Sequence, residues 1–218
     1  ARRVTYSEIE QIIICCTPGT RVATQKGEVA VEDLMPGDKV FTRDNGLQPL
    51  RWTGRRDLGA AELRAQPRLQ PVLIRKGALG RDLPERDMLV SPQHRMLITS
   101  DMAEIMFEER EVLIPAKHLT GLDGVEAVTD GVDTVETGSV SYLHLMFDHH
   151  EVVLADGAWS ESFQPADRTL KGIGDPQRAE ILSIFPELET LAGLNGYGAA
   201  RPSLKRHEAE LLVSRLQT

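Results

Sequence analysis

The sequence predicts a mainly β domain that is followed by a helical C-terminal extension. From Cys15 to about Ser162, turn signals recur at intervals of about ten residues, a spacing typical of short antiparallel strands. Between the turns, apolar and polar side chains alternate, as they do in a strand with one buried face. After Pro165 helix signals replace this alternation, so we expect a second structural region to begin there.

The expected strands lie between short turn sequences rich in glycine, proline, asparagine and aspartate. The turns are Pro18-Gly19, Gly27, Pro36-Gly37-Asp38, Asn45-Gly46, Gly54 and Asp156-Gly157. The strands are 12–14, 21–24, 38–42, 50–53, 72–75, 88–90, 96–99, 111–114, 135–140, 142–147 and, as the last, 151–155. The Ala- and Arg-rich stretch 59–71 fits either a loop or a short helix.

Two helices are expected in the C-terminal extension, residues 166–218. The first begins at Asp175-Pro176, because aspartate caps a helix N-terminus and proline suits the first helical turn. Pro186 should end this helix, since proline cannot continue the hydrogen-bond pattern. The second helix is expected over 202–216, and the glycine-rich segment 193–198 should link the two.

Charge, hydropathy and cysteine content exclude several classes of protein. The net charge of −8 argues against nucleic-acid and anionic-membrane partners, which clustered lysine and arginine bind. No segment approaches the roughly 20 apolar residues that span a bilayer. Cys15 and Cys16 are adjacent, which disfavours a disulfide, and two thiolates are too few for a cysteine-rich zinc site. We therefore expect no cofactor and no metal, and either a buried apolar cysteine or a reactive thiol.

Three short motifs carry the residues that could perform chemistry. The first, 15–20, reads Cys-Cys-Thr-Pro-Gly-Thr and opens the β domain. The second sets Ser91 and His94 three residues apart in a turn between two expected strands. The third, 142–157, holds three of the six histidines. Taken singly, the motifs fit equally a buried cysteine, a turn-closing serine with a surface histidine, and a polar turn.

The clustered histidines also allow a metal site formed by His144, His149 and His150, because imidazole is a zinc ligand. Adjacent residues of a strand point to opposite faces, which makes it hard for His149 and His150 to share one ion. The metal site is therefore a weaker interpretation, and we expect His149 to face solvent.

In order and spacing, the motifs together resemble the Hedgehog/intein (Hint) domain, and in particular its bacterial intein-like subgroup. The matching segments are Cys-x-Thr-Pro-Gly-Thr at 15–20, Val-x-Asp-Leu-x-Pro-Gly-Asp-x-Val at 31–40, Ser-Pro-x-His at 91–94, Tyr-x-His-Leu at 142–145 and His-Glu-Val-Val-Leu-Ala-x-Gly at 150–157. The resemblance implies a compact, horseshoe-like all-β domain over 15–165. An upstream leader, 1–14, would precede it, and the helical extension 166–218 would pack on it.

The resemblance implies that Cys15 is the nucleophile of an autocatalytic reaction on the protein's own upstream polypeptide. Its thiol would attack the carbonyl of Ile14 and turn the peptide bond into a thioester, an N-to-S acyl shift. Water, a thiol or an amine acceptor would then resolve the thioester. Cys16 is the alternative nucleophile, but its spacing to the Thr-Pro-Gly-Thr sequence fits the pattern less well.

The same resemblance assigns roles to the remaining motif residues. His94 would act as a general acid that protonates the departing nitrogen. Ser91 would hydrogen-bond the scissile peptide and orient His94. His144 and His150 are expected to position or deprotonate the thiol, with Asp148 orienting one of them.

The sequence departs from splicing inteins at the end of the β domain. Those inteins end in His-Asn and release the downstream chain by asparagine cyclisation, whereas the segment 156–162 contains no asparagine. We therefore expect cleavage or ligation without splicing. Two rival interpretations stay open: a non-catalytic, β-rich presentation module of a secreted protein, and a cysteine protease that uses Cys15 and His94 on other chains. The resemblance also implies a secreted or cell-surface protein, although we recognise no targeting signal in the sequence itself.

Overall fold

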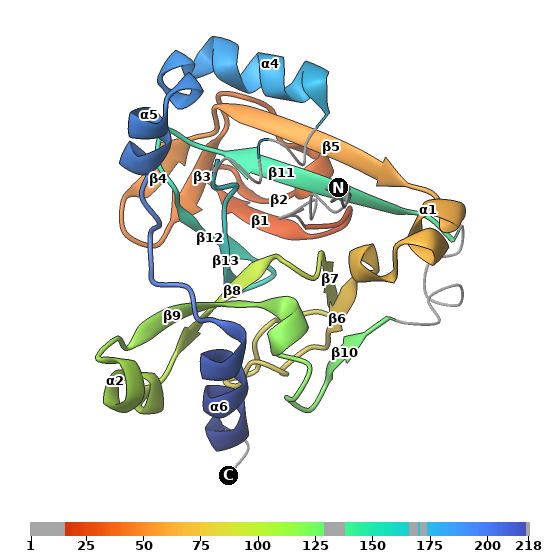
Figure 1. The fold of residues 1–218 in the computed structure, drawn as a ribbon, viewed down its shortest axis with the longest axis vertical. Coiled ribbons are helices and arrows are strands. Elements are labelled where there is room, and N and C mark those ends of the chain that lie inside the picture. The colour runs from red at the N-terminus through yellow and green to blue at the C-terminus, as the bar shows by residue number, and fades with distance from the viewer. Residues whose placement is uncertain (1–15, 129–137, 166–169, 171–173, 217–218) are drawn as a thin grey trace, which may run out of the picture.

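The structure, a computed structural model, describes residues 16–128, 138–165, 170 and 174–216 (Figure 1). These residues fold mainly into antiparallel strands, and helices follow towards the C-terminus. The mainly β fold with C-terminal helices that the sequence predicts is therefore confirmed. The expected leader, 1–14, and Cys15 lie outside the described residues, as does most of the strand expected at 135–140.

The largest sheet has eight strands in the order β2-β1-β3-β12-β13-β8-β9, and β4 also pairs with β3. Its strands are β1 (Arg21–Thr24), β2 (Gly27–Ala30), β3 (Lys39–Thr42), β4 (Gly46–Pro49), β8 (Arg95–Thr99), β9 (Glu111–Pro115), β12 (Val152–Ala155) and β13 (Ala158–Glu161). Because β12 pairs with both β1 and β3, the end of the β domain closes onto its beginning.

Two smaller sheets meet at the first described residue. Their strands are β10 (Val125–Ala127), β6 (Val72–Ile74) and β7 (Met88–Val90) in one sheet, and β11 (Val140–Met146) and β5 (Trp52–Leu58) in the other. Cys16 forms antiparallel bridges with Val90 of β7 and with Leu143 of β11. The chain at Cys16 therefore joins the two sheets edge to edge.

β11 is buried on both faces, which explains its nearly unbroken apolar sequence. Leu143 and Leu145 pack into a cluster with side chains of β1 and β3. Met146 packs on the opposite side, in a cluster that includes helix α4 (Asp175–Ile184). Figure 1 shows β5 and β11 between the first hairpins and this helix. The alternation of side chains along a strand therefore sets His144 on the side away from Leu143.

The predicted turn at Asp156 and Gly157 joins β12 to β13. Both residues have positive φ angles, 46° and 75°, which suits the two-residue hairpin turn that an Asp-Gly pair favours. The flanking residues Ala155 and Ala158 are paired across the hairpin. The buried Asp156 carboxylate also accepts a hydrogen bond from the Arg21 backbone N–H at 3.1 Å, which ties the turn to β1.

Several elements between and after the expected strands were not predicted. β2, β4, β10 and β13 are additional strands, so 151–155 is not the last one, as the sequence interpretation had it. Helix α2 (Asp101–Phe107) forms because the Ser100 hydroxyl accepts a hydrogen bond from the Met102 N–H and caps its N-terminus. The stretch 59–71 contains the short helix α1 (Ala60–Ala65) and the 3₁₀ turn η2 (Pro67–Leu69). Two more 3₁₀ turns are η1 (Val31–Asp33) and η3 (Ala116–His118).

The helical extension follows the prediction at its start and departs from it later. α4 begins at the predicted Asp175 and ends before Pro186, which instead opens the 3₁₀ turn η4 (Pro186–Glu189). Helix α5 (Leu191–Gly196) occupies part of the expected link, because the Thr190 hydroxyl caps it by accepting the Gly193 N–H. Helix α6 (Arg206–Leu216) starts later than the predicted residue 202.

The delayed start of α6 has a tertiary cause. Leu113 of β9 donates its N–H to the Pro202 carbonyl at 2.8 Å and accepts the Leu204 N–H at 3.0 Å. The segment around Ser203 therefore runs as an extended strand parallel to β9 instead of as helix.

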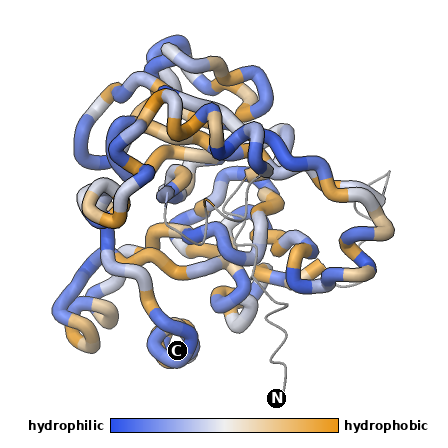
Figure 2. The backbone as a smooth tube through the Cα atoms, turned by 45° about the horizontal axis from the view of Figure 1, so that its top comes forward, coloured by the Kyte–Doolittle hydropathy of each residue, from blue (hydrophilic) through white to orange (hydrophobic). Residues whose placement is uncertain are grey.

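The extension packs at two separate places on the β domain. α4, η4 and α5 cover β5 and β11 at one end, while α6 lies beside α2 and β9 at the other (Figure 1). α6 buries Ala209, Leu212 and Val213 against the core that contains β8 and β9. Figure 2 shows hydrophobic and hydrophilic residues alternating over short distances along the tube, as expected for strands and helices with one buried face.

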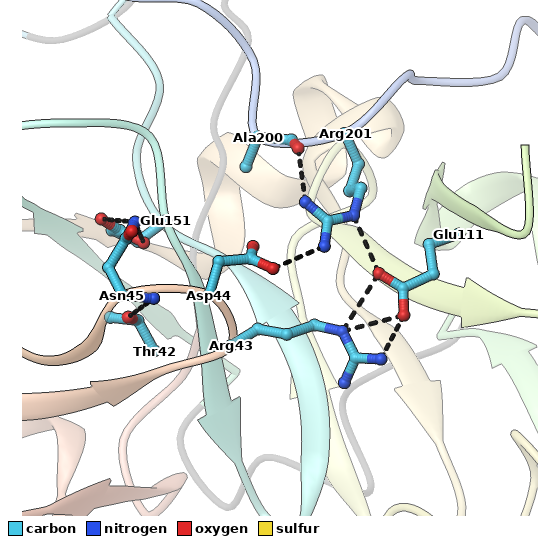
Figure 3. Close-up of polar contacts among 8 residues, drawn as sticks. All are labelled: Thr42, Arg43, Asp44, Asn45, Glu111, Glu151, Ala200 and Arg201. Atoms are coloured by element: carbon cyan, nitrogen blue, oxygen red, sulfur yellow. Dashed lines mark hydrogen bonds and ion pairs between the residues drawn. The ribbon is translucent and has the colours of Figure 1, made fainter.

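An ion-pair cluster fixes the segment that connects the two packing sites (Figure 3). Arg201 donates from Nε to Glu111 at 2.8 Å and from Nη2 to Asp44 at 2.7 Å. Arg43 forms an ion pair with the same Glu111 carboxylate, and its guanidinium stacks 5.1 Å from the centre of the Trp159 ring. One carboxylate thus holds two arginines from opposite ends of the sequence.

Candidate active site

The described chain begins as a strand that is hydrogen-bonded on two sides. The Cys16 N–H donates to the Leu143 carbonyl at 3.2 Å, and the Cys16 carbonyl accepts the Leu143 N–H at 2.9 Å. On the other side, Cys16 bridges Val90, and the Thr17 hydroxyl donates to the Leu89 carbonyl at 2.9 Å. The backbone at Cys16 is therefore held between β7 and β11.

The antiparallel register determines which residues lie towards the chain before Cys16. Ser91 follows Val90 and His144 follows Leu143, so each occupies the next position in that direction. Both side chains are buried. Two of the predicted site residues, from segments more than 50 residues apart, thus flank the same end of the Cys16 strand.

His94 is positioned by the turn that follows β7. Its N–H donates to the Ser91 carbonyl at 3.0 Å, and its own carbonyl accepts the Ala116 N–H at 2.8 Å. The imidazole is 1% exposed. Its Nε2 lies 2.5 Å from the Ser160 hydroxyl oxygen and 3.9 Å from the Cys16 sulfur. Its Nδ1 is buried and has no hydrogen-bond partner among the described residues.

Burial keeps both the imidazole and the neighbouring thiol neutral. Burial lowers the pKa of His94 to about 4; Glu161 opposes this shift and Arg95 adds to it. Burial raises the pKa of Cys16 to about 12, with Asp156 and Glu161 adding to the shift while a hydrogen bond from Ser160 opposes it. At neutral pH the site therefore contains a thiol and an imidazole, not a thiolate–imidazolium pair.

Ser160 and Glu161 of β13 belong to the site, and the sequence interpretation missed both. Ser160 is fully buried, and its strand pairs with β8 and β12. The buried Glu161 carboxylate accepts the Arg95 backbone N–H at 2.7 Å and lies 3.4 Å from the Arg95 guanidinium. The available signal was the polar Ser-Glu-Ser sequence at 160–162, shortly after the Asp156-Gly157 turn, although such a polar sequence by itself favours an exposed strand.

His144 lies in an aromatic part of the core beneath the helical extension. Its ring centre is 5.1 Å from that of Phe163, edge to face, and 6.0 Å from that of Trp52. The imidazole is 1% exposed. The structure thus sets His144 on the opposite face of β11 from Leu143, within the cluster that α4 covers.

His150 connects the extension to β13. Its Nδ1 accepts the Ala200 N–H at 2.9 Å, which requires that the ring proton sit on Nε2. That Nε2 lies 3.4 Å from the Glu161 carboxylate, and both side chains are buried. The structure brings Cys16, His94 and Ser160 together. His150 lies beside Glu161, the residue after Ser160, and not beside the thiol.

Two further polar residues of the third motif, Asp148 and His149, lie at the surface. His149 is exposed, and Asp148 forms an ion pair with Arg51 at 3.4 Å. Among the residues that the structure describes, no group of three or more histidine, cysteine, aspartate or glutamate side chains could hold a metal ion. In the same residues no helix has the length and apolar character needed to cross a membrane.

Comparison with known proteins gives a family and several structural neighbours. The family model of the Hint domain matches residues 14–167. The gp41-1 intein is 10% identical over 67% of this chain and 96% of that chain, with a TM-score of 0.37. The MchDnaB-1 intein is 10% identical over 68% and 99%, with a TM-score of 0.40. A bacterial intein-like domain from Clostridium thermocellum is 12% identical over 69% and 99%, with a TM-score of 0.39. The comparison with curated proteins gives no match.

Proposed function

The chain belongs to the Hint domain family, and from that premise we propose that it cleaves the peptide bond before Cys15 by an N-to-S acyl shift. Membership of the family supports an autoprocessing domain that acts on its own flanking polypeptide. The observation that carries the finer proposal is His94, a buried and neutral imidazole whose Nε2 lies 3.9 Å from the Cys16 sulfur.

The backbone of Cys16 is hydrogen-bonded between two strands, which supports a scissile bond immediately before Cys15. Leu143 and Val90 hold Cys16 from both sides, and Cys15 is covalently bonded to it. Continuing the antiparallel register by one residue would set Ser91 and His144 opposite Cys15, beside the proposed scissile bond. Strain or orientation that the fold imposed on that bond would favour attack on it.

The proposed reaction moves one proton and exchanges one bond. The Cys15 sulfur attacks the Ile14 carbonyl carbon, the C–N bond breaks, and a C–S bond forms in its place. His94 accepts the thiol proton and delivers it to the departing Cys15 nitrogen, which leaves as a free amine. A histidine held neutral by burial suits this role, because its ring nitrogen must first be able to accept a proton.

Four further residues support this transfer. The Ser91 hydroxyl hydrogen-bonds the scissile peptide, and its carbonyl already orients the His94 backbone. His144 positions the Cys15 side chain from the β11 side. His150 positions the Glu161 carboxylate, and Glu161 in turn favours protonation of His94 during the transfer.

Water, a thiol or an amine then resolves the thioester. Attack by any of them on the Ile14 carbonyl releases the Cys15 sulfur. Because the segment 156–162 contains no asparagine to cyclise, the chain downstream stays attached to the domain. The product is a cleaved or ligated upstream polypeptide, not a spliced one.

The proposal is tested by following intact mass in a protein that carries a longer upstream fusion. The parent is compared with Cys15→Ala, Cys16→Ala and His94→Ala, each with and without added thiol or hydroxylamine. We expect a break before Cys15 that nucleophiles accelerate, that Cys15→Ala abolishes and that His94→Ala slows by about 10²–10⁴-fold.

The other outcomes are equally informative. Cleavage that survives Cys15→Ala and is lost in Cys16→Ala would make Cys16 the nucleophile. A parent protein that stays whole under all conditions would leave the presentation module as the function. Cleavage of an added polypeptide at catalytic turnover would indicate the protease instead.

A further inference from the structure

The buried hydroxyl of Ser160 sits at the centre of the site, and the proposed reaction does not yet use it. Its oxygen lies 2.5 Å from His94 Nε2, and the same hydroxyl hydrogen-bonds the Cys16 thiol. Ser160 is fully buried on a strand that is paired on both sides, so its position is set by the sheet. A hydroxyl in this place has two polar neighbours and no access to solvent.

We propose that Ser160, together with the Cys16 thiol, fixes the tautomer of His94 and so keeps Nδ1 available for proton transfer. This inference rests on the proposed function, because it assigns an accessory role in that reaction. Ser160 is a positioning residue in this scheme, since it acts through His94.

A neutral imidazole has two ring nitrogens, of which one carries a proton and the other does not. A proton on Nε2 has the Ser160 oxygen as a close acceptor. A proton on Nδ1 would be a buried donor without an acceptor among the described residues, and leaving a buried donor unpaired is unfavourable. The surroundings therefore favour the Nε2–H tautomer.

The Cys16 thiol completes the chain of hydrogen bonds. When Ser160 accepts from His94 Nε2–H, its own O–H is free to donate, and the Cys16 sulfur is a weak acceptor within reach. Nδ1 is then the bare nitrogen, which is the atom that must accept the Cys15 thiol proton. In this arrangement Cys16 has a defined role. Its sulfur accepts the Ser160 O–H, and Cys15 is the residue that makes the nucleophilic attack.

The charged groups around this chain do not compete for the same hydrogen bonds. Glu161 and Arg95 both influence the His94 ring electrostatically, and Asp156 and Glu161 act on Cys16. One oxygen of the Glu161 carboxylate accepts the Arg95 backbone N–H, and the other lies 3.4 Å from both the Arg95 guanidinium and His150 Nε2. The tautomer therefore depends on the neutral Ser160 hydroxyl more than on any titrating neighbour.

The first test compares single-turnover cleavage rates of the full chain with an upstream fusion. Ser160→Ala should slow thioester formation by about tenfold, part of the 10²–10⁴-fold that general acid–base catalysis contributes. Ser160→Thr, which keeps the hydroxyl, should restore most of the rate. Ser162→Ala is the matched control, because its buried hydroxyl accepts the Glu151 N–H and does not contact His94.

The second test reads the tautomer itself and does not depend on cleavage. Nitrogen NMR of His94 in a Cys15→Ala background should show a proton on Nε2, and adding Ser160→Ala should produce a mixture of tautomers. An unchanged tautomer in Ser160→Ala would overturn the inference, as would a Ser160→Ala rate equal to that of the parent. If the parent never cleaves, the proposed function fails, while the NMR comparison still decides the role of Ser160.

Discussion

The site at His94 and the ion-pair cluster at Glu111 both join segments that are far apart in the sequence, but they do so with opposite chemistry. At His94 the imidazole and the Cys16 thiol are neutral and almost completely buried. At Glu111 they are charged and partly exposed, with two arginines sharing one carboxylate (Figure 3). The Glu111 side chain is 19% exposed, so water screens part of that interaction.

This difference in charge and burial matches two roles: the His94 site is built for a reaction, and the Glu111 cluster attaches the helical extension to the β domain. A buried neutral imidazole changes its protonation only when a reacting group supplies the proton, which is useful in a transfer step and costly for stability at low pH. A partly solvated ion pair holds the extension in place and is insensitive to the reaction. Substitutions in the two regions should therefore affect different observables.

The largest expected effect comes from removing the imidazole of His94. His94→Ala should lower the rate of cleavage before Cys15 by about 10²–10⁴-fold, because general acid–base catalysis by a side chain is worth that much. His149→Ala, at an exposed position of the same residue type, should cleave at the parental rate. Time courses of intact mass measure both. Equal rates for the two variants would contradict the assignment of the site.

The same histidine should make the fold sensitive to mild acid. Its pKa is depressed from 6.5 to about 4, so the unfolded chain binds a proton at a higher pH than the folded chain does. Stability is therefore lost as the pH falls from about 6.5 towards 4, by about 3 kcal/mol in total. Urea unfolding at several pH values measures the loss, and His94→Gln should remove this part of the pH dependence. A parallel loss in that variant would assign the effect to another group.

In the Glu111 cluster the expected effect is on stability alone. Glu111→Gln leaves Arg43 and Arg201 without their shared charge, and we expect a loss of about 2 kcal/mol at neutral pH. Hydrogen bonds from Arg43 are the main cause of the low pKa of Glu111, so its contribution is present above its ordinary pKa and disappears as the pH falls through the lower, folded value. The variant should therefore lose its difference from the parent in strong acid. Its cleavage rate at neutral pH should match the parent's; a slower rate would couple the two regions.

The smallest expected effect concerns the packing of α5 over β11. The Tyr197 hydroxyl donates to the Phe147 carbonyl at 2.8 Å in a buried environment. Tyr197→Phe should cost about 1 kcal/mol, the usual net value of one such hydrogen bond, and should be detected as a lower melting temperature. Thr190→Ala, which removes the cap of the same helix, is a matched control for local loosening. If Tyr197→Phe changed the cleavage rate and Thr190→Ala did not, the contact of Tyr197 with the β domain would be needed to hold His144 in position.

Much of the fold was predictable because it depends on local patterns. β1 and β7 begin and end at the predicted residues, and the Asp156-Gly157 turn forms where its sequence required it. α4 starts at Asp175 and ends before Pro186, although its N-cap is Gly174 and not the predicted Asp175. These features depend on a few neighbouring residues, whose conformational preferences act before any tertiary contact is made.

The failures have a common origin in long-range pairing. β13 was not predicted, because polar residues such as Ser160 and Glu161 are expected to be exposed. Their burial is explained only by their partners across the sheet. The late start of α6 was missed because Leu113 draws residues 202–204 into a strand-like segment. Cross-strand partners and docking contacts are not encoded in any short window of sequence.

For the candidate site, the sequence by itself determined the reactive residue types, their order and their spacing: adjacent thiols, a Ser-Pro-x-His turn, and histidines near the end of the β domain. Only the tertiary structure decided that the Cys16 strand lies between β7 and β11, and that His94 meets Ser160 while His150 meets Glu161. The physical reason is burial. Whether an imidazole is neutral, which of its nitrogens is bare and which hydroxyl it contacts depend on how the sheets exclude water around it.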